Sequence, residues 1–224
     1  MSTPSVDIID LLAGIAPGSP LAAVRDQRAQ ARENAQRSFT ALLEPENPGS
    51  FPLRERYAVA AYIAQLHGFA EAAEFYGDLL GDEDPELVDL VASAASASAA
   101  RGPVGEYREP GLHAESTPAP HWAPDAASAA QFGPRIAAAL GHTHLLVFRP
   151  REASPAALAS LVDAGFSPDD IVTLSQLISF LSFQLRAAWG LRVLAATSSA
   201  APATASAADG TAHTIAHHSA GGTR

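Results

Sequence analysis

Cysteine is absent from the 224-residue chain, and its absence excludes more chemistry than any other feature of the sequence. Without cysteine the chain forms no disulfide, has no thiolate metal ligand and offers no thiol nucleophile. Lysine is absent too, so all 14 basic residues are arginine, a bias typical of GC-rich bacterial genomes. The sequence also lacks a G-x-S-x-G motif, so nothing supports a serine hydrolase of the kind that uses one.

Basic charge is scarce, with 14 basic residues against 24 acidic ones and a net charge of −10. Nucleic acids and anionic membrane surfaces both attract clustered cations, so we expect neither as a partner. No apolar run reaches the roughly 20 residues of a membrane span, and the opening stretch, MSTPSVDIIDLLAG, lacks the basic region of a secretory signal. A cytoplasmic location is therefore expected.

Helical patterns occupy most of the chain, and a serine or aspartate followed by proline marks four predicted helix starts: Ser19–Pro20, Asp84–Pro85, Ser154–Pro155 and Ser167–Pro168. The first is expected to open one polar, arginine-rich helix that faces solvent or another subunit. The last is expected to open a helix buried on all sides, because apolar residues cover most of its circumference. No strand alternation persists, so the predicted fold is all-α.

The predicted organisation is one domain over residues 1–195, which includes a proline-rich linker over residues 101–124. Residues 196–224 consist mainly of alanine, serine, threonine, glycine and histidine, and are expected to form a disordered tail. Three histidines of this tail either bind a metal loosely or belong to a solvated, compositionally biased segment: His213, His217 and His218.

Two landmarks of the sequence carry a family resemblance. The stretch LRERYAVAAYIAQLHGFAEAAEFYGDLL runs one helix into another at a glycine, and LVDAGFSPDDIVTLSQLISFLSFQLRAAWGL joins a short helix to a long one. In order and spacing, over about residues 38–95 and 140–194, they resemble the carboxymuconolactone decarboxylase (CMD) and AhpD-like superfamily. More closely, they resemble a cysteine-less CMD-domain group related to its peroxidase-related branch. The resemblance implies an AhpD-like helical fold and a homo-oligomer.

Residues at the helix junction depart from the family pattern where its redox chemistry resides. The resemblance places Gly68 on the glycine before the first cysteine, the two cysteines of the CxxC motif on Phe69 and Ala72, and the following histidine on Tyr76. Peroxide reduction needs one thiolate to attack the O–O bond and a second thiol to resolve the sulfenic acid. A thiol peroxidase activity is therefore excluded under this alignment.

Glu55, His67 and Tyr76 are the candidate catalytic residues. The resemblance places Glu55 on the glutamate of the family's proton relay, and the other two flank the helix junction. Together they would form a small acid–base cluster if burial raised the pKa of the carboxylate. The alternative is that Glu55 is an exposed first-turn carboxylate, and that Tyr76 contributes buried area and one hydrogen bond.

His142, His144 and Arg186 are the candidate substrate-binding residues, the last because it matches the arginine of the second landmark. On a helix, residues two apart point in different directions, so the two histidines would not readily share one metal. No set of three or four ligands with zinc spacing stands out, so no metal site and no cofactor is predicted.

The sequence supports two principal functional hypotheses. In the first, this is a thiol-independent CMD-type protein that binds a small acidic metabolite, with acid–base chemistry by Glu55 and a neighbouring histidine or tyrosine at most. In the second, it is a non-catalytic partner subunit of an active alkylhydroperoxidase-like paralogue, and Phe69 and its apolar neighbours plug the former site. A metal-binding protein using His142, His144 and the tail histidines is a third hypothesis.

Overall fold

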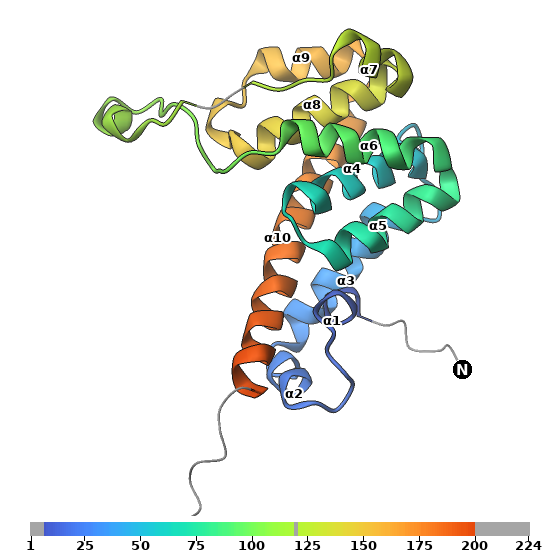
Figure 1. Ribbon diagram of the computed structural model, residues 1–224, viewed down its shortest axis with the longest axis vertical. Helices are drawn as coiled ribbons and strands as arrows, with labels where there is room; N and C mark the ends of the chain where they lie inside the picture. Colours follow the sequence, from blue (N-terminus) through green and yellow to red (C-terminus); the bar gives the residue numbers. More distant parts are fainter. Residues whose placement is uncertain (1–6, 119–120, 200–224) are drawn as a thin grey trace, which may run out of the picture.

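The computed structural model describes residues 7–118 and 121–199, and over these residues the protein is all-α, as predicted (Figure 1). The helices are α1 (Ile8–Ala13), α2 (Pro20–Asp26), α3 (Ala29–Leu43), α4 (Leu53–Leu66), α5 (Ala70–Glu83), α6 (Pro85–Ser98), η1 (Pro110–Glu115), α7 (Ala126–Phe132), α8 (Pro134–Phe148), η2 (Pro150–Glu152), α9 (Pro155–Asp163) and α10 (Pro168–Ser199). No strand occurs in the described part; one isolated β-bridge joins Gly105 to Thr117.

Helix α4 forms the centre of the protein. All eight residues from Tyr57 to Ala64 are buried, because α5, α6, α8 and α10 surround the helix (Figure 1). Four of the eight are alanine, whose small side chain lets neighbouring helices approach closely. The middle of α4 is thus buried on every side.

Side-chain caps begin the helices where the sequence predicts them. Ser19 Oγ accepts a hydrogen bond from the backbone N–H of Ala22, and the Asp84 carboxylate accepts one from Glu86. At the start of α10 the caps are reciprocal: Ser167 Oγ accepts from the N–H of Asp170, whose carboxylate accepts from the N–H of Ser167. These bonds satisfy N–H groups that a helix start leaves without an intrahelical partner.

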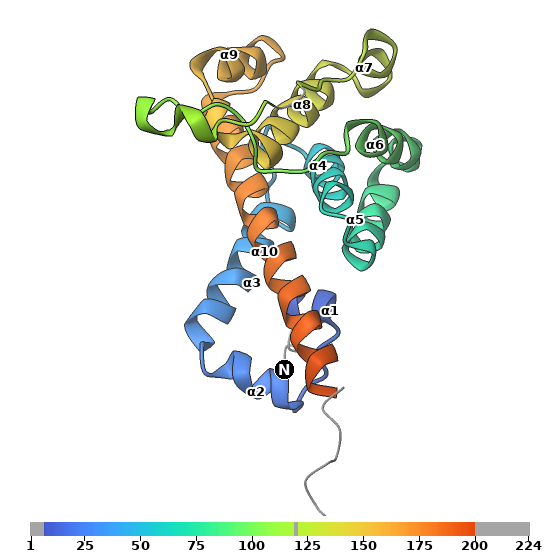
Figure 2. The same cartoon turned by 60° about the vertical axis from the view of Figure 1, so that its left-hand side comes forward.

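The arginine-rich segment is two helices, α2 and α3, and not the single helix predicted from its sequence. Two of its arginines bond to carboxylates at the start of α1: Arg25 lies 2.6 Å from Asp7 and 2.6 Å from Asp10, and Arg32 bonds to both carboxylates. Figure 2 shows these three helices beside the C-terminal half of α10, away from α6–α9. Arg25 and Arg32 therefore form an ion-pair cluster with Asp7 and Asp10 within the chain.

Helix α10 is buried on one side only, so the prediction of a helix buried all round was wrong. Leu174, Leu181 and Leu185 are buried against the core, whereas Val172 and Phe183 on the opposite side are 55% and 56% exposed. Periodicity could not separate the two sides, because apolar residues occur on both. The outward side of α10 therefore leaves large apolar side chains exposed in the described chain.

By length and composition one helix of the described chain is apolar enough to cross a membrane: Pro168–Thr197, with a mean hydropathy of 1.3. The sequence predicts no such segment, because no apolar run in it reaches the roughly 20 residues of a membrane span. The evidence for a span is weak, since core helices pass the same test and this one packs along α1, α3, α4 and α8.

Candidate functional site

The α4–α5 elbow positions the candidate site. Gly68 adopts a left-handed conformation with φ of +65°, which a residue with a side chain rarely accepts, and it turns the chain between the two helices. The N–H of Phe69 then donates to the carbonyl of Ala64, and α5 begins at the next residue. This turn places His67 and Phe69 on either side of the glycine, facing α10.

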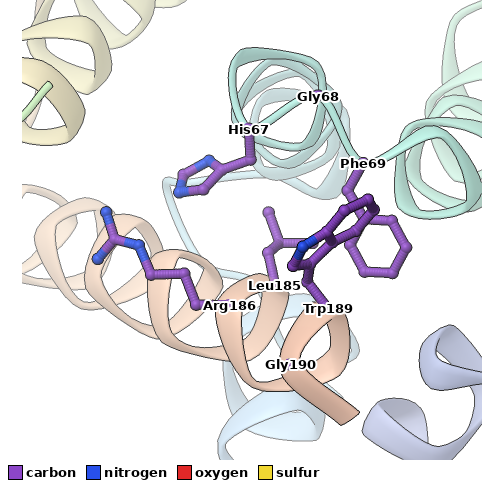
Figure 3. Close-up of a pocket in the computed structure, with 7 residues that line it drawn as sticks. All are labelled: His67, Gly68, Phe69, Leu185, Arg186, Trp189 and Gly190. Atoms are coloured by element: carbon purple, nitrogen blue, oxygen red, sulfur yellow. The ribbon is translucent and has the colours of Figure 1, made fainter. Parts of the chain in front are cut away.

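A pocket of about 240 Å³ lies between the elbow and α10 (Figure 3). The elbow contributes His67, Gly68 and Phe69, and α10 contributes Leu185, Arg186, Trp189 and Gly190. In Figure 3 the side chains of His67 and Arg186 extend to the same side, while those of Phe69 and Trp189 pack together at the other. The structure thus brings together three residues that the sequence analysis singled out separately: His67, Phe69 and Arg186.

One ring nitrogen of His67 has a hydrogen-bond partner among the described residues, and the other has none. Its Nδ1 lies 2.9 Å from the carbonyl oxygen of Ile63, whereas its buried Nε2 has no hydrogen-bond partner among the described residues. Burial lowers the pKa of His67, and the nearby Arg186 lowers it further. The neutral form of the ring is therefore favoured.

Aromatic rings form the apolar wall of the pocket. Phe69 is 2% exposed and meets Trp189 edge to face, with ring centroids 5.6 Å apart. The guanidinium of Arg192, which is ion-paired with Glu71, lies over the ring of Phe69 at 5.6 Å from its centroid. Arg186 has no carboxylate partner within the described chain, and no residue that lines the pocket is acidic.

Tyr76 and Ala72 lie in the core and do not line the pocket. Both are fully buried, and the Tyr76 hydroxyl donates to the side-chain oxygen of Gln184 on α10. Burial raises the pKa of Tyr76 far above its usual range, so the phenol stays protonated. For Tyr76 the structure agrees with the packing alternative, that of a buried ring with one hydrogen bond.

Glu55 lies at the opposite end of α4 from the pocket. Twelve residues of helix separate it from His67, a distance of about 18 Å at 1.5 Å per residue. The proposed cluster of Glu55, His67 and Tyr76 is therefore not assembled, and the prediction that they act together was wrong. The prediction failed because it assigned Glu55, at the start of α4, and His67, at its end, to one site.

The carboxylate of Glu55 instead belongs to a structural ion pair. Arg135 of α8 donates to both its oxygens, from Nε at 2.8 Å and from Nη2 at 2.9 Å. The same guanidinium donates to the carbonyls of Gly165 and Ser50 and stacks over the ring of Phe166. It thereby ties the starts of α4, α8 and α10 together.

His142 and His144 are buried in α8 and do not line the pocket. His144 Nε2 lies 3.1 Å from the carbonyl of Ser98, and its ring packs against Trp122 and Phe148. Neither nitrogen of His142 has a partner in the part of the chain described. The structure thus does not join these histidines to Arg186 in one site.

Metal binding finds no support in the described residues, which contain no group of three histidine, aspartate or glutamate side chains placed to hold an ion. The tail histidines lie outside these residues: His213, His217 and His218.

Leu185, Trp189 and Gly190 were missed by the sequence analysis. Together with Arg186 they occupy positions i, i+1, i+4 and i+5 of one helix, a spacing that puts them on one surface. The sequence shows this spacing, but it does not show that this surface of α10 lies against the α4–α5 elbow.

Comparison with known proteins adds no family assignment. No protein-family model matches the sequence, and no curated protein matches it either. The resemblance to the CMD and AhpD-like superfamily and the cytoplasmic location therefore stay predictions.

Replacing Arg135 by methionine tests the structural role of the Glu55 ion pair. The side chains of Glu55 and Arg135 are only 10% and 22% exposed, so loss of the guanidinium leaves a mostly buried carboxylate unpaired. We expect the free energy of unfolding to fall by about 2–4 kcal/mol, measured by urea denaturation. Arg37→Met removes an exposed pair with Glu33 and should cost about 0.5 kcal/mol or less. Equal effects of the two substitutions would contradict this role.

We expect the free energy of unfolding to fall in mild acid because of three histidines whose pKa is lowered in the folded protein. Burial lowers the pKa of His67, His142 and His144. Because the unfolded chain takes up their protons first, as pH falls through about 6.5, the folded state loses stability there. Denaturation from about pH 7.5 to about pH 5.5 should show a decline of up to about 1.4 kcal/mol per pH unit for each such proton.

His142→Gln should reduce this slope by up to about 1.4 kcal/mol per pH unit, the contribution of one proton. A pH-independent stability of the wild type would contradict the prediction.

Proposed function

We propose that the protein binds a small acidic metabolite at the elbow pocket, with Arg186 as the anion-binding group. The observation that carries the proposal is the charge of the pocket. In a chain of net charge −10, its lining has one arginine, no carboxylate and an apolar wall. A guanidinium without a carboxylate partner is suited to bind a planar carboxylate through paired hydrogen bonds.

The size of the pocket restricts the ligand. A volume of about 240 Å³ lies below the roughly 300–1,000 Å³ of sites for drug-sized molecules. Phe69, Leu185 and Trp189 offer apolar contacts to the body of the ligand. A small acid with a ring or a short branched chain fits this combination of a cation and an apolar wall.

The proposal includes the resemblance to the CMD and AhpD-like superfamily, but without its redox chemistry and without a catalytic role for Glu55. We propose a cysteine-less relative of the CMD and AhpD-like proteins in which Phe69 and Ala72 fill the positions of the redox pair as packing residues. Both are buried, and Phe69 also forms part of the pocket wall. Acid–base chemistry by Glu55 forms no part of this proposal, because Arg135 holds that carboxylate at the other end of α4.

Arg186→Gln tests the proposed function with phenylacetate as the probe acid and neutral phenylacetamide as its control. The wild type should bind phenylacetate more tightly than the amide, as measured by isothermal titration calorimetry. Loss of a hydrogen bond to a charged group should weaken phenylacetate binding by about tenfold to a hundredfold.

The control variant is Arg37→Gln, which removes an exposed arginine of α3 that is paired with Glu33 and lies outside the pocket lining. It should leave the phenylacetate dissociation constant within about twofold of the wild-type value. If the wild type does not distinguish acid from amide, or if both variants behave alike, the proposal is wrong.

A second copy of the chain is the partner that we propose for the outward side of α10. Residues 171–185 contain no charged residue. A groove of about 750 Å³ runs over α3, α9 and α10, and no ionisable side chain lines it. Because two copies that each carry a charge of −10 repel each other, an uncharged and apolar contact is the one that opposes association least.

Val172→Ser together with Phe183→Ser should therefore shift the protein toward monomer. These two outward side chains are 55% and 56% exposed in the single chain, so removing them should weaken association and not folding. Sedimentation velocity at micromolar concentration measures the shift. The control Leu112→Ser changes an exposed leucine of η1 and should leave the oligomer intact. A wild type that is monomeric throughout would favour a paralogue as partner and contradict this proposal.

A further inference from the structure

We infer that the elbow pocket selects acids that also carry a hydroxyl group, because His67 Nε2 needs a hydrogen-bond donor beside the anion held by Arg186. This inference rests on the proposed function and narrows it from small acids to small hydroxy acids with an apolar body. It is a statement about binding and involves no covalent step.

The tautomer of His67 follows from its main-chain partner. The carbonyl oxygen of Ile63 can only accept hydrogen bonds, and it lies 2.9 Å from Nδ1. Nδ1 must therefore carry the proton. In the neutral ring the other nitrogen, Nε2, then presents a lone pair and no hydrogen. The free protein thus has an acceptor, and not a donor, at the ring nitrogen of His67 that Ile63 leaves free.

This acceptor lies buried without a partner among the described residues, an arrangement that costs free energy. A bare carboxylate bound by Arg186 would not remedy it, because carboxylate oxygens are acceptors too. Nε2 is closed to solvent in the free protein, so a hydroxyl on the ligand would donate to it once the His67 ring turns toward the bound molecule, while the carboxylate receives the guanidinium. The side chains of His67 and Arg186 extend to the same side of the elbow (Figure 3).

Neighbouring groups keep the imidazole neutral. Burial is the largest cause that lowers the pKa of His67, and the positive charge of Arg186 lowers this pKa further, against the hydrogen bond to Ile63, which raises it. None of the other residues that line the pocket is ionisable: they are Gly68, Phe69, Leu185, Trp189 and Gly190. Protonation of His67, which would turn the acceptor into a donor for a plain carboxylate, is therefore opposed from within the pocket.

The apolar wall of the pocket indicates what kind of group forms the rest of the ligand. Phe69 and Trp189 meet edge to face at one side of the pocket, and Leu185 lies between them and the polar pair (Figure 3). An aromatic ring can pack against this wall with its polar groups directed to His67 and Arg186. A hydroxy acid with one ring combines these features within the volume available.

Two pairs of acids, each differing by one hydroxyl, test the inference on the full-length protein. Mandelate is compared with phenylacetate, and 3-hydroxybenzoate with benzoate, by isothermal titration calorimetry near neutral pH. One added neutral hydrogen bond should make the better enantiomer of mandelate, or 3-hydroxybenzoate, bind about five times more tightly than its partner. The ratio of the two dissociation constants is the readout, since it cancels losses common to both acids.

Two substitutions of His67 separate its two nitrogens. The amide of asparagine can replace Nδ1 toward Ile63 but reaches no further, whereas glutamine can place an oxygen acceptor near the position of Nε2. We expect the hydroxyl preference to fall to about onefold in His67→Asn and to persist in His67→Gln. Thermal melts of both variants check that each one folds.

The outcomes distinguish the inference from the proposed function. If the acids bind and Arg186→Gln weakens them, but neither pair shows a hydroxyl preference, only the inference fails. The same holds if the preference survives His67→Asn, or if nitrogen-15 NMR finds the proton of the neutral ring on Nε2. If no acid binds at all, both fail.

Discussion

The burial of α4 on all sides is the constraint on which the rest of the structure depends. A helix with neighbours all round can carry few large side chains, and alanines at positions 58, 60, 61 and 64 meet this need. Its two ends are then the places where polar groups can occur. At the first, Glu55 and Arg135 join three helix starts, and at the second Gly68 turns the chain and exposes His67 to a pocket. The structural ion pair of Glu55 and the pocket proposed to bind a ligand thus lie at opposite ends of one helix.

Local signals in the sequence predicted four helix starts, those of α2, α6, α9 and α10, because a capping side chain and a proline act within one turn. The all-α class followed from the same signals. Features that depend on distant residues could not be predicted in this way. The partner of Glu55 lies 80 positions along the chain, and the break between α2 and α3 occurs where Arg25 and Arg32 both bond to carboxylates of α1. The exposed side of α10 was missed because the helix is apolar on both sides.

The candidate site was predicted in part. His67, Phe69 and Arg186 were identified, two from the helix junction and one from the long helix, and the pocket joins them. The family resemblance placed Tyr76 in the site, yet this residue belongs to the core, where its hydroxyl donates a hydrogen bond to the side-chain oxygen of Gln184. Trp189 was not identified, although it is three residues from Arg186. A site between two helices depends on how they pack, and one sequence does not specify that.

The central claim is that the elbow pocket, and no other surface, receives a small acid. Chemical-shift mapping by NMR with phenylacetate tests it most directly, because every backbone amide reports at once. The account predicts that the shifts concentrate at residues 67–69 and 185–190 and disappear in Arg186→Gln. Shifts concentrated on α1 and α2, or spread evenly over the described helices, would contradict it.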